Sequence, residues 1–356
     1  MKIWNIGQAV TREEVIWCYQ TLLGREPESD DAVLPHFESG SFKSLVRSFV
    51  CTPEYVARTL ALSKIQLYER PEEELPEPEE HVLMSPEHNE ALAKAEFDAG
   101  VLEVRSTPSM LTLETSSRCN LRCVMCPQAI NVVKRPKHME SEMIVSLERF
   151  IRQSNNIQLH GIGEPLASPA FWDSLKYIPE SCDSSINTNF TVLDERRLKN
   201  LVASQLRAIN VSLDAARPET YQKIRGFSFA EVTNNIRRFV EARRESGKKF
   251  PQLFMNMTLM RSNIEEVLEF IDMAADMGAD SIYFWHLNHW PDEEMAPYVL
   301  EREGWTFDYK KEGLWNFPEL SNEYLRKAEI RARERGIGLR LDQNKTVYFD
   351  PLESAA

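Results

Sequence analysis

The chain has 356 residues, of which 42% are hydrophobic, and a formal net charge of -13. This length suits two or three domains, one of which must bury a substantial core. The acidic balance, without a stripe of Lys and Arg interleaved with aromatic residues, excludes nucleic acid as an expected partner. No run of about 18 apolar residues and no basic-then-apolar leader is found, so we expect no membrane insertion and a cytoplasmic location.

Residues 1–68 are predicted to form a small all-α domain. Apolar residues at helical spacing follow Thr11, a capping candidate, and Gly24 is expected to end that helix. A second helix is predicted from Phe42 to Phe49, ending before the next proline.

Two stretches of this region, Tyr19–Pro27 and Phe49–Tyr55, are similar to a small helical domain of unknown function from bacterial multidomain proteins. That domain often accompanies enzymes of surface glycans, and it implies a protein partner as one role for the module. Cys18 and Cys51 are interpreted as apolar core positions of this domain.

Residues 69–107 are interpreted as a linker followed by a lead-in helix. The segment Pro71–Glu80 contains six glutamates and three prolines, a composition that favours an extended, solvated chain. A helix is predicted near residues 88–104.

From residue 108 to about 290 short apolar segments alternate with amphipathic ones, which predicts a parallel α/β sheet. Strands are expected at 110–114, 156–160, 184–188, 207–213, 252–259 and 280–286. This periodicity does not separate a barrel from an open doubly wound sheet.

Residues 291–356 are expected to form a C-terminal extension. A helix is predicted over 321–335, capped by Ser321 and ended by Gly336, with a short strand at 337–341.

Half of the six cysteines lie in one eight-residue segment, as Cys119, Cys123 and Cys126. The spacing is too tight for mutual disulfides, so ligation of a metal or a cluster is the physical expectation. Three thiolates leave one coordination position open for a small molecule. A Cys3His zinc site that borrows His138 or His160 is the alternative.

Five motifs in order resemble those of radical SAM enzymes. They are Glu114–Pro127, Gly161–Pro165, Ile186–Asn189, Val211–Asp214 and Tyr221–Gly226. The nearest likeness is the branch related to SPASM-domain proteins, although this chain has no cysteine after Cys182 for an auxiliary cluster. The resemblance implies a partial (β/α)6 TIM-like barrel, with the all-α domain in front of it.

The same resemblance implies one 4Fe-4S cluster and S-adenosyl-L-methionine (SAM) as cofactors. Cys119, Cys123 and Cys126 would bind three irons, and the SAM amino and carboxylate groups would chelate the fourth. Reductive cleavage of SAM would then give a 5'-deoxyadenosyl radical that abstracts hydrogen from a small-molecule substrate. A one-electron donor such as flavodoxin or ferredoxin is the implied partner.

The glycine-rich motif is implied to hold the methionyl amine of SAM. Its candidate residues are Gly161, Ile162, Gly163 and Glu164, since glycine permits close backbone approach and a carboxylate accepts from an ammonium group. The alternative is a tight turn with an incidental glutamate.

Four further residues match the family by position. Asn189 and Ser212 are candidates for the ribose or substrate, Arg225 for the methionyl carboxylate, and Met125 for the adenine. Turn chemistry for Asn189 and a surface ion pair for Arg225 are the structural alternatives.

The sequence indicates the substrate less clearly than it indicates the cofactors. A sugar or nucleotide-sugar is suggested by the usual neighbours of the helical module, which is analogy only. Modification of a ribosomally made peptide and a non-catalytic zinc-binding interaction protein are the rival functions. No general acid or base is assigned without a substrate pose.

Overall fold

A computed structural model describes most of the chain. The described residues are 10–39, 42–50, 52, 54–55, 83–289 and 291–341. They belong to two compact units, Met1–Glu80 and His81–Ala356. The acidic linker and Cys51 lie outside the described residues.

The first unit is helical, as the apolar spacing predicts. Its elements are α1 (Arg12–Cys18), η1 (Tyr19–Leu23), α2 (Asp30–Val33), η2 (Leu34–Ser39) and α3 (Phe42–Val50). Thr11 and Glu14 form a reciprocal capping box at the start of α1. Gly24, at φ 69°, ends the helical run in the left-handed conformation. Cys18 is fully buried in the core, which confirms its interpretation as an apolar position.

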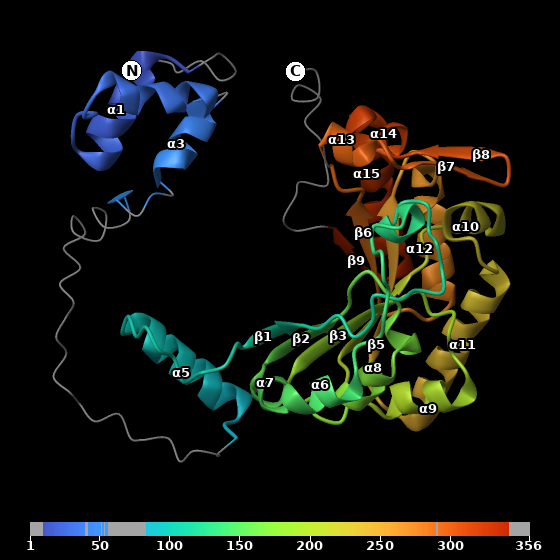
Figure 1. Ribbon diagram of the computed structural model, residues 1–356. Helices are drawn as coiled ribbons and strands as arrows, with labels where there is room; N and C mark the ends of the chain where they lie inside the picture. Colours follow the sequence, from blue (N-terminus) through green and yellow to red (C-terminus); the bar gives the residue numbers. More distant parts are fainter. Residues whose placement is uncertain are drawn as a thin grey trace. The chain divides into compact units, whose positions relative to one another are not determined.

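The second unit is built on one parallel sheet of seven strands (Figure 1). The strands are β1 (Met110–Thr112), β2 (Asn156–Leu159), β3 (Asp183–Thr188), β4 (Ala208–Ser212), β5 (Gln252–Leu259), β6 (Ser281–His286) and β9 (Gly338–Leu341). Their order in the sheet is β1-β2-β3-β4-β5-β6-β9. A doubly wound sheet reverses its strand order, whereas this sheet follows the chain without reversal, as barrels do. The sheet stays open, because β1 and β9 are its two edges.

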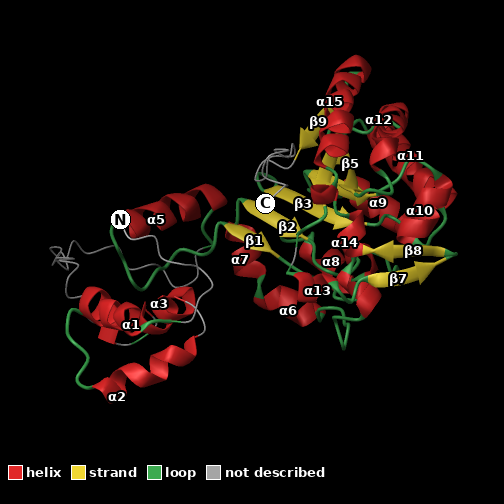
Figure 2. Ribbon diagram, turned by 90° about the horizontal axis from the view of Figure 1, so that it is seen from above, coloured by secondary structure: helices red, strands yellow, loops and turns green. Residues whose placement is uncertain are grey.

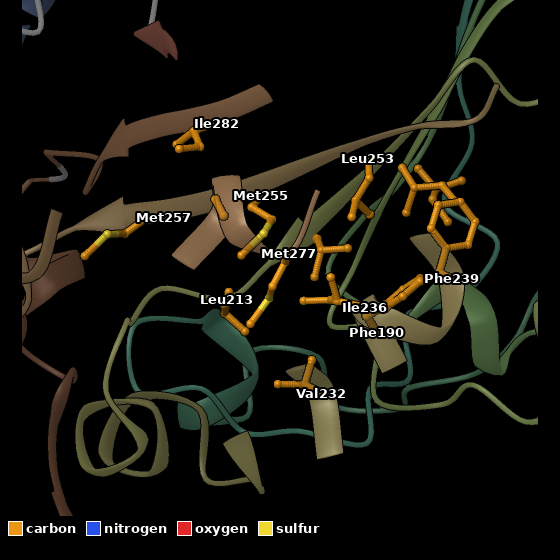
Figure 3. Close-up of a cluster of buried hydrophobic side chains, with 14 of the residues drawn as sticks. Phe190, Leu213, Val232, Ile236, Phe239, Leu253, Met255, Met257, Met277 and Ile282 are labelled. Atoms are coloured by element: carbon orange, nitrogen blue, oxygen red, sulfur yellow. The ribbon is translucent and has the colours of Figure 1, made fainter. Parts of the chain in front are cut away.

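Helices cover one face of this sheet (Figure 2). They are α6 (Ser141–Ser146), α7 (Glu148–Gln153), α8 (Pro169–Ser174), α9 (Glu195–Ala203), α10 (Pro218–Arg225), α11 (Phe229–Ser246), α12 (Val267–Asp276) and α15 (Pro318–Arg335). Alternate strand residues such as Met255 and Ile282 belong to the same buried hydrophobic cluster as Ile236 and Phe239 of α11 (Figure 3). The prediction of an α/β fold of the partial-barrel type, with an N-terminal helical region, is therefore confirmed, although the sheet has a seventh strand, β9.

Two helix boundaries differ from the predictions. Helix α15 begins at Pro318, whose fixed φ suits the first helical position, and Ser321 is buried inside the helix instead of capping it. The lead-in helix α5 (Pro86–Asp98) ends earlier than residue 104, next to Gly100 at φ 65°.

Between β6 and β9 the chain forms an antiparallel hairpin that the sequence analysis missed. Strands β7 (Val299–Arg302) and β8 (Trp305–Asp308) are joined by Glu303 and Gly304, both at positive φ. Two such residues make the tight turn whose twist matches a hairpin. The short helices α13 (Asp292–Met295) and α14 (Tyr309–Glu312) flank it.

None of the helices in the described part of the chain is both long and apolar enough to cross a membrane.

Candidate active site

The three clustered cysteines lie in the long loop that follows β1, at the end of the sheet where parallel barrels build their sites. All three thiols are free, with Cys123 buried and Cys119 and Cys126 half-buried. Burial raises the pKa of the Cys126 thiol to about 11. The backbone closes tightly here, because Cys126 N donates to Cys123 O at 3.0 Å and Val124 N donates to Ile224 O at 3.0 Å.

Nitrogen donors from three parts of the chain point at these sulfurs. Leu121 N lies 3.5 Å from Cys119 Sγ, and Asn189 Nδ2 lies 3.7 Å from the same atom. Arg225 Nη1 lies 3.4 Å from Cys123 Sγ. Such donors stabilise negative charge on sulfur, as thiolate or cluster ligation requires.

Arg225 is buried, so the surface ion pair considered for it is wrong. Its side chain is 10% exposed and forms an ion pair with Asp214, which is 1% exposed. Asp214 adopts φ 65°, and its Oδ1 accepts from Thr258 N at 2.7 Å. Within the described chain the buried Nε of Arg225 has no hydrogen-bond partner. An unpaired buried guanidinium nitrogen beside the cysteine loop suits a carboxylate ligand.

Hydrogen bonds of Glu164 join the glycine-rich motif to the end of β3. Its Oε1 accepts from Thr188 Oγ1 at 2.6 Å and from Leu166 N at 3.0 Å, while Oε2 accepts from Asn189 N at 2.8 Å. Burial raises the pKa of this carboxyl. Oε1 is thus occupied, and only Oε2 retains capacity for a further donor.

Gly163 of the motif is required by the backbone of the cysteine loop, and Gly161 lies against a side chain of that loop. A Cβ on Gly163 would lie 2.1 Å from Ser116 O and 2.5 Å from Arg118 O. A Cβ on Gly161 would lie 2.3 Å from Oε1 of Glu114, the atom that also accepts from Ile162 N at 2.6 Å. The motif therefore packs its backbone directly on the loop that carries the thiols.

The remaining predicted site residues are less closely tied to the sulfurs. Ser212 ends β4 and lies opposite Asn256 of β5. Met125 packs against an apolar cluster that includes Val124 and Ile224.

His138 and His160 have partners away from the thiols. His138 Nδ1 lies 2.9 Å from Ser116 Oγ, and His160 Nε2 lies 3.1 Å from Gln158 Oε1. Burial lowers the pKa of both imidazoles. In the described ranges no three His, Cys, Asp or Glu side chains form a group that could hold one metal ion. Cluster thiolates bind separate irons, so they need not converge on one point.

Arg302 of β7 is a contributor that the sequence analysis missed. Its Nη1 donates to Ile224 O at 3.0 Å and to Lys223 O at 3.3 Å, and Nη2 donates to Arg122 O. One guanidinium thus joins the end of α10 to the cysteine loop. No local sequence signal marks Arg302, because its partners lie far away in the chain.

Residues 113–283 match a family model described as the radical SAM superfamily. The chain contains a radical SAM domain. Proteins of this superfamily use a 4Fe-4S cluster together with SAM, which is the cofactor pair that the motifs imply.

Curated relatives of this chain include a probable GTP 3',8-cyclase of Methanosarcina mazei. It is 32% identical over 174 residues, which cover 45% of this chain and 50% of the relative. The PqqA peptide cyclase of Streptomyces rochei is 28% identical over 177 residues, covering 49% of this chain and 47% of the relative. The chain thus spans about half the length of these relatives.

The fold also resembles Streptococcus suis SuiB bound to its precursor peptide SuiA. That likeness has a TM-score of 0.52 and 15% identity, and covers 94% of this chain and 66% of SuiB. SuiB bound to S-adenosylmethionine gives a TM-score of 0.51 with 16% identity, over 72% of this chain and 55% of that one. At these identities the likeness concerns the fold alone.

Proposed function

We propose that this chain is a single-cluster radical SAM enzyme, in which Cys119, Cys123 and Cys126 bind three irons of a 4Fe-4S cluster. The observation that carries the proposal is the arrangement of Arg225. Its Nη1 reaches the Cys123 sulfur at 3.4 Å, while its buried Nε has no hydrogen-bond partner among the described residues. A guanidinium in that position would receive the methionyl carboxylate of SAM beside the open iron.

When bound, the cluster supplies the electron that cleaves SAM to methionine and a 5'-deoxyadenosyl radical, which abstracts hydrogen from the substrate. The chain's own residues hold the reactants. Glu164 Oε2 would accept from the methionyl amine, and Asp214 fixes the direction of Arg225.

The other cofactor contacts are proposed from position. Gly161, Ile162 and Gly163 would present backbone atoms to the methionyl group. Asn189 and Ser212 would contact the ribose, and Met125 the adenine.

The substrate is proposed to be a small molecule, with a sugar or nucleotide-sugar as the favoured class. The named relatives include a GTP cyclase and a peptide cyclase, so peptide modification is the second candidate. The absence of cysteine after Cys182 argues for one cluster in this sequence.

The proposed partners and domain boundaries are those expected from the sequence. A flavodoxin or ferredoxin would supply electrons in a reducing, cytoplasmic setting, and the N-terminal helical domain, residues 1–68, would serve a protein partner. Residues 69–107 would be the linker and lead-in helix, 108–290 the catalytic barrel and 291–356 its extension.

The test uses protein reconstituted anaerobically with iron and sulfide, then reduced with dithionite in the presence of SAM. Chromatography should detect 5'-deoxyadenosine from the wild type. Zinc in place of iron would support the zinc-binding interaction protein. Intact SAM beside a properly formed cluster would contradict the enzyme proposal.

A further inference from the structure

The two faces of the parallel sheet differ sharply in chemistry. The residues that pack on the helices are apolar, whereas the alternate residues on the inner face are mostly amides, hydroxyls and aromatic rings. From the level of Gln158 upward, the inner-face residues of β2 to β6 are Gln158, Ser185, Asn187, Ala208, Asn210, Ser212, Gln252, Phe254, Asn256, Thr258, Ser281, Tyr283 and Trp285. Parallel sheets usually bury both faces under apolar residues, so a polar inner face indicates a binding surface.

Strand register brings these polar side chains into adjacent pairs. Asn187 lies opposite Asn210, and Ser212 lies opposite Asn256. The next strand adds an aromatic side chain, because Asn256 also lies opposite Tyr283. Asn210 itself lies opposite Phe254, so the polar side chains form a patch of two neighbouring rows across β3 to β6.

Asn256 carries an unsatisfied polar atom in this patch. The residue is only 8% exposed, yet its Oδ1 has no hydrogen bond within the described chain. Buried amide oxygens are nearly always paired in folded proteins. Asn256 alternates with Met255 and Met257, which belong to the helix-side core, so its amide lies on the inner face.

The aromatic side of the patch is flat and partly accessible. The rings of Tyr283 and Trp285 stack with centroids 4.1 Å apart and planes 13° apart, and Trp285 is 39% exposed. These stacked rings form a flat apolar surface that suits the C–H face of a sugar ring. Side-chain amides suit hydroxyl groups, because an amide both donates and accepts hydrogen bonds.

The scarcity of cations on this surface argues against a phosphate site. Along β2 to β6, which are described in full, the inner face carries one charged side chain, Asp183 at the N-terminal end of β3. Arg340 of β9 lies opposite Tyr283 and is held 4.8 Å from the centre of the Phe254 ring. A nucleotide or phosphate site would need converging cations.

We propose that the patch formed by Asn187, Asn210, Asn256, Tyr283 and Trp285 binds the uncharged, polyhydroxylated ring of a sugar. This inference rests on the proposed function, since it names the substrate class of the same barrel. Any phosphate carried by the substrate stays outside the sheet. The amides pair with ring hydroxyls, and the stacked aromatic rings contact the opposite face of the sugar ring.

The test is saturation-transfer NMR on the full chain, loaded with cluster and SAM under anaerobic conditions. The probes are glucose, galactose, rhamnose, N-acetylglucosamine and UDP-N-acetylglucosamine. The variants are Asn210→Leu and Asn256→Leu, and Asn234→Leu on the exposed face of α11 is the matched control. Circular dichroism checks that each variant folds. If the Asn256 variant does not fold, the half-buried Asn210 still provides the test.

At least one sugar should bind the wild type and the Asn234 variant equally, and bind both patch variants at least tenfold more weakly. For the UDP-sugar, saturation should reach the sugar protons more than the uracil protons. The proposal would be overturned if no sugar binds, or if the Asn210→Leu and Asn256→Leu variants bind sugar as tightly as the wild type. So would GTP or a short peptide that binds through these residues when sugars do not. SAM cleavage by the wild type is measured separately. If SAM is cleaved but no sugar binds, only the sugar proposal fails; if SAM is not cleaved, the proposed function fails as well.

Discussion

Arg225 Nη1 lies 3.4 Å from the Sγ of Cys123, although the two residues are 102 positions apart in the chain. The adjacent backbone atoms are also joined, because Val124 N donates to Ile224 O at 3.0 Å. The end of α10 and the cysteine loop are therefore joined by both a side-chain contact and a backbone hydrogen bond. This coupling gives the site a geometry that can be tested residue by residue.

Replacing Arg225 by Lys should weaken SAM binding at least tenfold while the protein still folds. Lysine keeps the charge that pairs with Asp214 but loses the guanidinium Nε, the nitrogen that has no partner among the described residues and would donate to a carboxylate. A tenfold loss corresponds to about 1.4 kcal/mol. Equilibrium dialysis of radiolabelled SAM against the reconstituted protein measures it.

The exposed Arg244, which pairs with the neighbouring Glu241, provides a control for this change. Arg244→Lys should bind SAM like the wild type. Equal affinity in the Arg225 and Arg244 variants would rule out a carboxylate contact through Arg225.

Gly163→Ala should disrupt the cysteine loop. The new Cβ would meet Ser116 O and Arg118 O at distances that no packed structure permits, so the backbone must move. We expect a loss of about 1–3 kcal/mol in the free energy of unfolding, together with reduced iron content. Denaturant unfolding and iron analysis measure the two effects.

Gly247→Ala separates this steric effect from the general cost of replacing a glycine. Gly247 adopts φ 68°, but a Cβ at this position would have no other atom within 4 Å. That variant should lose about 1 kcal/mol through backbone strain and keep its iron. Normal iron loading in Gly163→Ala would contradict the close packing described above.

Arg302→Met should loosen the cysteine loop from a distance. It removes the donors to the carbonyls of Arg122 and Ile224 while keeping a side chain of similar length. We expect a stability loss of about 1–3 kcal/mol, and faster amide hydrogen exchange in residues 120–126. Unchanged exchange in that loop would show that the hairpin does not hold it.

Glu164→Gln should destabilise the junction between the glycine-rich motif and β3. An amide replaces one acceptor oxygen by a donor, which then faces Thr188 Oγ1 and Leu166 N or Asn189 N. We expect a loss of about 1–3 kcal/mol in unfolding free energy. Glu241→Gln on the surface of α11 is the control, and equal unfolding midpoints would refute the role assigned to Glu164.

Much of the fold was predictable because its signals are local. The apolar runs at 252–259 and 280–286 became β5 and β6 almost unchanged, since each strand buries a repeating apolar set on one face. The sequential strand order was not readable from periodicity, because helix and strand spacing are the same in barrels and doubly wound sheets. The family resemblance supplied it.

The site was predictable where motif residues sit next to each other, and not where they meet across the chain. The ion pair between Asp214 and Arg225 requires that β4 and α10 fold back on each other, which no local pattern encodes. Arg302 is a similar case. The hairpin that carries it does have a signal, the Glu303-Gly304 turn, which the surrounding aromatic residues obscured.

The most direct test of the central claim is the electron paramagnetic resonance spectrum of the dithionite-reduced protein, recorded with and without SAM. A cluster held by Cys119, Cys123 and Cys126, with its fourth iron open to SAM, predicts a 4Fe-4S signal whose g values shift when SAM binds. Cys123→Ala should lack that signal, and Cys182→Ala, a buried core position, should retain it. A cluster signal that SAM leaves unchanged, or one that survives in Cys123→Ala, would contradict the account.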